Sequence, residues 1–211
     1  MGNKIDMKSI KVKNTYDLPI LGSPSRSIRE CLDVKAVGVC PSSDSRVKPK
    51  LVVKEGDSVQ SGQVLYYDKA DESVKFLSPG TGVISKITYG PRRRLDEVVI
   101  TLSDSDDAVS FDSLVSSGPD VMDRKAIVHA LHEGGLWQRL TEYPFQGTPK
   151  SDVIPPSIYI TLDNDEAFMP ESDVYLKGRL EDFKKGLEVL SKLTATVHVG
   201  IAEKSVSLLP E

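Results

Sequence analysis

Short apolar runs separated by turn residues fill the first half of the chain. Gly56 and Gly62 stand where tight turns need a positive φ or a close backbone approach. A further turn over residues 79–82 (PGTG) precedes another apolar run. The pattern predicts at least five short strands, over Lys50–Val53, Val64–Tyr67, Val74–Leu77, Val83–Thr88 and Leu95–Leu102. Strands this short, with turns this frequent, are typical of a small β sandwich or barrel.

Helical periodicity replaces this pattern in the second half. Asp120 and Asp123 precede apolar residues at helical spacing and predict a helix with an acidic first turn, which Gly134-Gly135 ends. An apolar stripe predicts a longer helix later in the chain, with the members Leu176, Leu180, Phe183, Leu187, Leu190 and Leu193. Strands are predicted on either side of this helix, over Ser157–Leu162 and Thr194–Ile201. The order strand, helix, strand favours a parallel βαβ unit.

Three regions follow from this change of pattern. Residues 1–103 are predicted to form a β module, with an N-terminal arm around Tyr16–Ile20 that packs against it. Residues 104–119 are an acidic, serine-rich linker whose carboxylates repel one another and bury nothing. Residues 120–211 form an α/β domain. A parallel two-stranded layer leaves sheet edges and helix faces uncovered, so we expect this domain to be incomplete and the chain to be a fragment, natural or engineered.

Composition describes an ordinary soluble protein, with 39% hydrophobic and 27% charged residues. The net charge of -4 gives no general attraction for nucleic acid or anionic lipid. The dense basic run Arg92–Arg94 follows Gly90-Pro91 and is interpreted as a solvated hairpin tip. Cys31 and Cys40 form no CxxC pair and are interpreted as free thiols. The sequence shows no signal peptide and no apolar run of membrane-spanning length, so we expect any work at a membrane to depend on partner subunits.

The segment 54–87 resembles the half-repeat of biotinyl and lipoyl carrier domains. It carries the pattern KEGDxVxxGQxL followed by SPxxG. In those carriers the modified lysine lies at the tip of a hairpin between two glycine-rich halves. Lys69 and Lys75 are the lysines of that interval, and neither has the methionine neighbours of a biotin carrier. A structural module with solvated lysines is the preferred interpretation, and a carrier domain modified on Lys69 or Lys75 is an alternative.

Other catalytic signatures are missing from the sequence. His129 and His132 could share a helix face, but His198 is remote in sequence and the three histidines do not make a metal set. No GxSxG nucleophile elbow occurs, and no GxGxxG or GxxxxGK[ST] phosphate loop. We therefore predict no catalytic residue and no metal site in this chain.

The order of motifs along nearly the whole chain supports a more specific resemblance. The segments that carry it are residues 16–20 (YDLPI), 48–65 (KPKLVVKEGDSVQSGQVL), 78–82 (SPGTG), 90–93 (GPRR), 135–137 (GLW), 144–145 (PF) and 187–194 (LEVLSKLT). In this order they resemble the N-terminal part of the NqrA component of the Na+-translocating NADH:quinone oxidoreductase. The resemblance implies a mixed α+β and α/β chain: a β barrel-sandwich hybrid (biotinyl/lipoyl-like) module, then the start of an α/β Rossmann-like domain.

The same resemblance implies a function. The whole enzyme passes electrons from NADH to ubiquinone and exports Na+, with its flavins and NADH oxidation on other subunits. This chain is then expected to be a soluble peripheral subunit on the cytoplasmic side of the bacterial inner membrane. It would scaffold the complex, bind its other subunits, contact quinone and hold no redox centre of its own. A free-standing binding paralogue, no longer assembled into the complex, is the remaining alternative.

Two features locate the expected site. Flavin-binding relatives carry a glycine run between a strand and a helix, whereas here Gly134-Gly135 is followed by the bulky Leu136 and Trp137. We therefore predict that the nucleotide site of those relatives is degenerate and that this chain binds no cofactor. Trp137 and Phe145 could instead line an apolar groove for a quinone ring or a partner helix, although core packing is the preferred interpretation of both.

Overall fold

The computed structural model divides the chain into two compact units. It describes residues 8–11, 20–31, 33–41, 47–115, 118, 121–162 and 168–202. One unit is Cys31–Pro155, and the other combines the chain up to Glu30 with the chain from Pro156 onward. This division places the helix Arg124–Glu133 in one compact unit with the β strands, whereas the boundary drawn at 104–119 from the sequence places that helix in the second domain.

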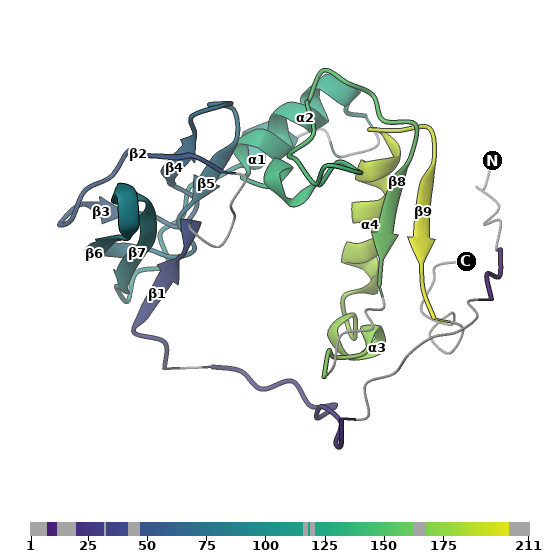
Figure 1. Cartoon of the computed structure of the whole chain (residues 1–211), viewed down its shortest axis with the longest axis horizontal. Coiled ribbons are helices and arrows are strands. Elements are labelled where there is room, and N and C mark those ends of the chain that lie inside the picture. The colour runs from purple at the N-terminus through teal and green to yellow at the C-terminus, as the bar shows by residue number, and fades with distance from the viewer. Residues whose placement is uncertain are drawn as a thin grey trace. The chain divides into compact units, whose positions relative to one another are not determined.

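Among the described residues of the Cys31–Pro155 unit, seven strands build the β module (Figure 1). They are β1 (Ala36–Val39), β2 (Pro49–Leu51), β3 (Ser58–Val59), β4 (Val64–Asp68), β5 (Lys75–Leu77), β6 (Gly82–Tyr89) and β7 (Leu95–Leu102). One sheet has the order β1-β7-β6-β3 and the other β2-β4-β5, and every neighbouring pair is antiparallel. All five predicted strands are present, and Gly56 and Gly62 have the positive φ values expected of them, 89° and 85°.

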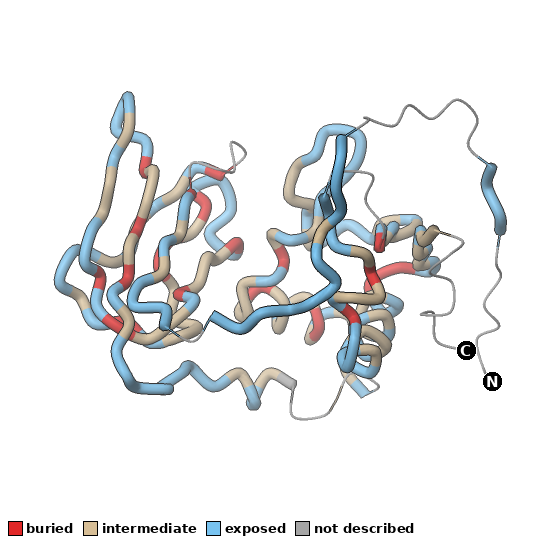
Figure 2. The backbone as a smooth tube through the Cα atoms, turned by 90° about the horizontal axis from the view of Figure 1, so that it is seen from below, coloured by how far each residue is buried: buried red, intermediate tan, exposed pale blue. Residues whose placement is uncertain are grey.

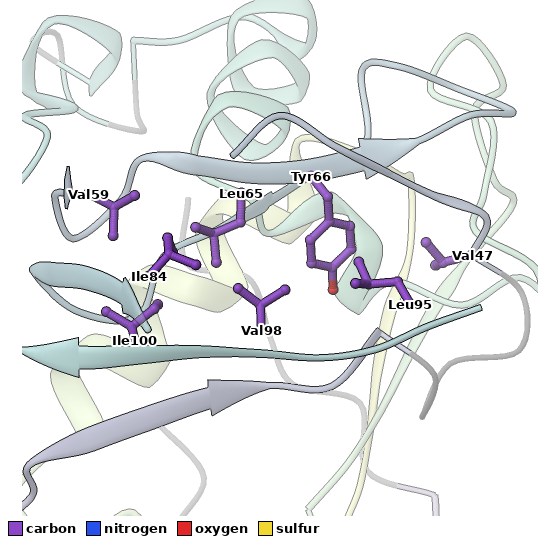
Figure 3. Close-up of a cluster of buried hydrophobic side chains, with 8 residues drawn as sticks. All are labelled: Val47, Val59, Leu65, Tyr66, Ile84, Leu95, Val98 and Ile100. Carbon is purple, nitrogen blue, oxygen red and sulfur yellow. The ribbon is translucent and has the colours of Figure 1, made fainter. Parts of the chain in front are cut away.

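The inward residues of the two sheets form one hydrophobic core (Figure 3). Its buried members are Val47, Val59, Leu65, Tyr66, Ile84, Leu95, Val98 and Ile100. Burying each aliphatic side chain of this kind stabilises the fold by about 1.5–3 kcal/mol. In the same unit the buried residues lie mainly along the strands, and the turns are largely exposed (Figure 2).

Two α-helices follow the strands within the same unit, α1 (Asp112–Val115) and α2 (Arg124–Glu133). Asp123 is the N-cap of α2, and its Oδ1 accepts a hydrogen bond from the N–H of Ala126 at 2.8 Å. The acidic first turn predicted for this helix is therefore a cap at Asp123, and Asp120 lies outside the described residues. The exposed acidic stretch before α1 is tied to the β module, because the N–H of Val109 donates to the carbonyl of Ser61 at 2.8 Å.

The second unit contains the predicted parallel pair, β8 (Ile158–Thr161) and β9 (Val197–Gly200). Between them lie α3 (Ser172–Tyr175) and α4 (Leu180–Ser191). The single helix predicted from Leu176 onward is interrupted instead, because a turn with Gly178 at φ 75° separates α3 from α4. Leu176 and Leu193 at the ends of the apolar stripe are buried, and the members between them are half-buried.

The N-terminal segment reaches this second unit. Most of the arm predicted around Tyr16–Ile20 lies outside the described residues. Just after it, Arg26 forms ion pairs with Glu171 and Asp173 at the start of α3. None of the described helices is long and apolar enough to span a bilayer.

Candidate functional site at the end of helix α2

The last turn of α2 packs on the β4–β5 hairpin. Glu133 Oε1 accepts a hydrogen bond from Lys75 Nζ at 2.5 Å, and both side chains are about two-thirds buried or more. His132 Nδ1 lies 3.0 Å from the carbonyl oxygen of Ser73 in the same hairpin. The hydrogen bond from Lys75 holds the pKa of the Glu133 carboxyl below its ordinary value, against the opposing effect of partial burial. These contacts join residues almost sixty positions apart and explain why α2 clusters with the β module.

Gly134-Gly135 forms the C-terminal cap of α2. The N–H of Gly135 donates to the carbonyl oxygen of His132 at 3.1 Å, and the N–H of Leu136 donates to the carbonyl oxygen of Leu131 at 2.8 Å. These two hydrogen bonds form a Schellman motif. Gly135 has φ 63°, and a Cβ at this position would lie 2.7 Å from Leu77 Cγ. The glycine is thus required by backbone conformation and by close packing on β5.

This cap differs physically from a phosphate-binding glycine loop. Phosphate loops present free N–H groups at the N-terminus of a helix, where the helix dipole is positive. Gly134-Gly135 stands at a C-terminus, where the dipole is negative, and the N–H of Gly134 also bonds within the helix, to the carbonyl of Ala130 at 2.8 Å. The geometry is therefore the opposite of the one that favours a bound phosphate.

Trp137 is a core residue of this corner. It lies in the short helix η3 (Trp137–Arg139) and is only 3% exposed. Its ring stacks on that of His132 with the centroids 4.9 Å apart, and its Nε1 donates to the carbonyl of Pro149 at 2.8 Å. Trp137 thus joins the end of α2 to the chain that returns after the next loop.

Phe145 has the opposite environment at the tip of that loop. Its side chain is 87% exposed, and that of Tyr143 is 82% exposed. The loop is closed below them by a bridge in which the N–H of Glu142 donates to the carbonyl of Gly147 at 2.9 Å. A cis peptide bond joins Tyr143 to Pro144. We call residues 142–147 the aromatic turn.

The two residues singled out from the sequence are therefore separated by the structure. Trp137 is buried and Phe145 is exposed, so the described residues do not place them in one groove. The sequence reasoning missed Tyr143, which is the exposed neighbour of Phe145. The tripeptide Tyr143-Pro144-Phe145 was the available signal, because a proline between two aromatic residues favours a turn over a buried helix or strand.

The lysines considered as carrier sites are not at a free hairpin tip. Lys75 lies within β5 and is held by Glu133. Lys69 directly follows β4, and its N–H continues the strand pairing by donating to the carbonyl of Lys48 at 2.9 Å. The tip itself is a turn in which the N–H of Val74 donates to the carbonyl of Asp71 at 3.0 Å. This geometry does not favour the carrier alternative.

The remaining candidate side chains are distributed over the chain. His129 is exposed, and His198 stacks on Tyr159 in the second unit with the ring centroids 4.7 Å apart. Among the described residues no cluster of three or more metal-ligating side chains occurs. Neither Cys31 nor Cys40 forms a disulfide, as predicted.

Comparison with known proteins identifies two successive domains of one family. Residues 10–103 match the NqrA N-terminal barrel-sandwich hybrid domain, and residues 122–210 match the NqrA second alpha/beta domain. This confirms the fold class predicted from the sequence.

Curated relatives are named as the NqrA component of Na(+)-translocating NADH-quinone reductase. The protein of Alcanivorax borkumensis is 35% identical and that of Saccharophagus degradans 36% identical, each over 88% of this chain and 41% of the relative. The protein of Neisseria meningitidis serogroup C is 34% identical over 90% of this chain and 42% of the relative. The chain thus spans about two-fifths of the length of these relatives. With both domain models matched in succession, the chain belongs to the NqrA family.

Proposed function

We propose that this chain acts as a peripheral, non-catalytic subunit of a Na+-translocating NADH:quinone reductase. The observation that carries the proposal is the succession of two NqrA domains, together with relatives named as the NqrA component of that enzyme. The other subunits of the complex are then its partners, and its place is the cytoplasmic side of the bacterial inner membrane. In this role the chain scaffolds the complex, while the redox centres lie on other subunits.

The aromatic turn is the part of the surface that best fits contact with another component of the complex. Tyr143 and Phe145 are each more than four-fifths exposed, and aromatic side chains contribute disproportionately to protein interfaces when they become buried. The turn is held at its base by the bridge between Glu142 and Gly147. A surface that is ordered before binding loses little conformational entropy on association.

A capture experiment tests the proposal. The purified chain is immobilised and incubated with detergent-solubilised membranes that contain the remaining subunits of the complex. We expect capture by the native chain and a loss of about tenfold or more in affinity when Tyr143→Ser and Phe145→Ser are combined, because two aromatic anchors are removed. Tyr159→Ser is the matched control, since it removes another exposed aromatic ring from the second unit.

The outcomes test separately whether the chain binds the other subunits and whether it binds them through the aromatic turn. If the native chain captures none of these subunits, the assembly proposal is wrong and the free-standing paralogue gains support. If the double variant and the control capture the subunits equally well, assembly stands but the aromatic turn is not the contact.

Quinone contact and the lack of a redox centre are a further part of the proposal. The capped Gly134-Gly135 corner leaves no helix N-terminus there for a flavin or NADH phosphate. Titration with flavin mononucleotide and NADH should therefore give no saturable binding, and stoichiometric binding of either would overturn this part. A photoreactive ubiquinone analogue should label the aromatic turn at Phe145 in preference to the buried Trp137.

A further inference from the structure

A second surface feature lies on the β module. One groove with a volume of about 590 Å³ is lined by the cationic side chains of Lys48, Lys50, Lys69, Arg93 and Arg94. The whole chain carries a net charge of -4, so this concentration of positive charge is local. Residues from three separate segments converge here: the start of β2, the end of β4 and the β6–β7 turn.

Lys48 and Lys69 form a like-charge pair across two strands. Pro49 on β2 pairs with Asp68 on β4, and the N–H of Lys69 donates to the carbonyl of Lys48 at 2.9 Å, so the two lysines are opposite neighbours. Like charges directly opposite on an antiparallel pair are destabilising. Among the described residues neither lysine forms an ion pair.

The carboxylate nearest to this pair is committed to the backbone. Asp68 is 8% exposed, and its Oδ1 accepts hydrogen bonds from the N–H of Lys48 and the N–H of Ala70, each at 3.1 Å. These two hydrogen bonds fix the backbone at Lys48 and at Ala70, the residue that follows Lys69. The negative charge of Asp68 offsets part of the repulsion between the lysines through space, but it forms no ion pair with either lysine among the described residues.

The β6–β7 turn brings arginine to the groove at a conformational cost. Arg92 and Arg93 have φ values of 58° and 57°, in the left-handed region that non-glycine residues rarely adopt. The turn is closed by the N–H of Gly90, which donates to the carbonyl of Arg94 at 2.8 Å. Unfavourable backbone conformations of this kind concentrate at functional sites.

The carboxylates around the groove balance only part of its charge. Lys50 Nζ lies 3.6 Å from Glu72 Oε1, and Arg94 Nε lies 3.5 Å from Asp96 Oδ1. These ion pairs are weak because their side chains are partly to largely exposed to solvent. In the part of the chain that the structure describes, Lys48, Lys69 and Arg93 form no ion pair, and the buried carboxylate of Asp68 offsets only part of their combined charge. Beneath it the groove is apolar, because Val47 and Leu95 belong to the buried core.

We propose that this groove binds the phosphate group of a small organic phosphate or of a lipid headgroup. Phosphate oxygens can accept several charge-assisted hydrogen bonds at once and would relieve the repulsion between Lys48 and Lys69. The concave shape favours a compact anionic group over the extended backbone of a nucleic acid. The inference is independent of assembly with other subunits, because every residue involved belongs to this β module.

Titration of the full chain tests the proposal. Inorganic pyrophosphate and glycerol 3-phosphate are titrated by calorimetry, and vesicles of phosphatidylglycerol are compared with vesicles of phosphatidylcholine by co-sedimentation. The variants Lys69→Gln and Arg93→Gln should each weaken phosphate binding about tenfold, the effect of losing one hydrogen bond between charged groups. Lys86→Gln is the matched control, because Lys86 is exposed on β6 outside the groove.

A stability readout separates a binding site from a merely solvated surface. Without phosphate, Lys69→Glu should raise the thermal midpoint because it turns a repulsive cross-strand pair into an attractive one. Pyrophosphate should raise the midpoint of the native chain and leave that of Lys69→Glu unchanged. Binding of the free phosphates assigns the site to a small organic phosphate, and binding of phosphatidylglycerol vesicles alone assigns it to a lipid headgroup. No binding in either arm, or equal losses in the groove variants and in Lys86→Gln, would overturn the proposal.

Discussion

The packing of α2 on the β module makes Gly135 a position where a single methyl group should be costly. Gly135 adopts φ 63°, and an added Cβ would lie 2.7 Å from Leu77 Cγ and 3.3 Å from the carbonyl oxygen of Lys75. Alanine in the left-handed conformation costs about 1 kcal/mol or more, and overpacking adds about 1–3 kcal/mol. Gly135→Ala should therefore lower the free energy of unfolding by about 2–4 kcal/mol.

Gly56→Ala is a control that carries only the conformational part of this cost. Gly56 has φ 89° in the same unit, and a Cβ there would meet no atom within 4 Å. The expected loss is thus about 1 kcal/mol. Leu77→Ala supplies the complementary test, because it removes the atoms that the new methyl group would strike. In the Leu77→Ala background the cost of Gly135→Ala should fall toward that of Gly56→Ala in the native chain, with a small remainder because the Lys75 carbonyl oxygen stays 3.3 Å from the new Cβ.

Urea denaturation followed by tryptophan fluorescence measures these differences directly. Trp137 is the single tryptophan of the chain and stacks on His132 at the end of α2, so its emission reports the region under test. Unfolding free energies follow from linear extrapolation to zero denaturant. Equal costs for Gly135→Ala and Gly56→Ala would show that α2 does not closely approach β5, and the account of this corner would be wrong.

Further predictions concern single side chains of the same region. Trp137→Ala should cost about 3–5 kcal/mol, measured by circular dichroism during urea denaturation, because it empties a core position and leaves the Pro149 carbonyl without its partner. The hydrogen bond from Lys75 lowers the pKa of the Glu133 carboxyl below its ordinary 4.5. The ion pair therefore stabilises the folded state fully above pH 4.5, and this stabilisation is lost as acid protonates Glu133 in the folded protein. Glu133→Gln should therefore flatten the fall of the urea midpoint below pH 4.5. The intact mass of protein from its native source should show Lys69 and Lys75 unmodified, and an added lipoyl or biotinyl mass would restore the carrier alternative.

Local pattern predicted the strands of the β module well. Residues 95–102 were predicted as one strand and form β7 with the same bounds, and its second half alternates as expected, with Val98 and Ile100 buried and Val99 and Thr101 more exposed. The pattern gave no comparable signal for β1 or β3. Ser58–Val59 is too short to show a period, and β1 has no fully buried residue.

The helical half was less predictable, for two physical reasons. An apolar stripe continues across a break when the break falls between its members, so the leucine spacing could not reveal the turn at Gly178. Contacts between distant residues leave no periodic signal at all. The pair of Lys75 and Glu133 is an example, and it holds α2 against the β4–β5 hairpin. The sequence likewise could not show that Trp137 is buried and Phe145 is exposed, because both are bulky aromatic residues near the same helix.

The contacts that immobilise the carrier-like hairpin also order the aromatic turn. Glu133 holds the β4–β5 hairpin through Lys75, and His132 holds it through Ser73. The hairpin that would bear the modified lysine of a carrier domain is therefore packed against α2. His132 stacks in turn on Trp137, whose indole N–H binds the Pro149 carbonyl on the far side of the turn. Because both ends of residues 138–148 are anchored in this way, the exposed rings at the tip are positioned before any partner arrives. The packing that fixes the hairpin thus also fixes the turn that we propose as a contact surface, and a surface ordered before binding loses little conformational entropy on association.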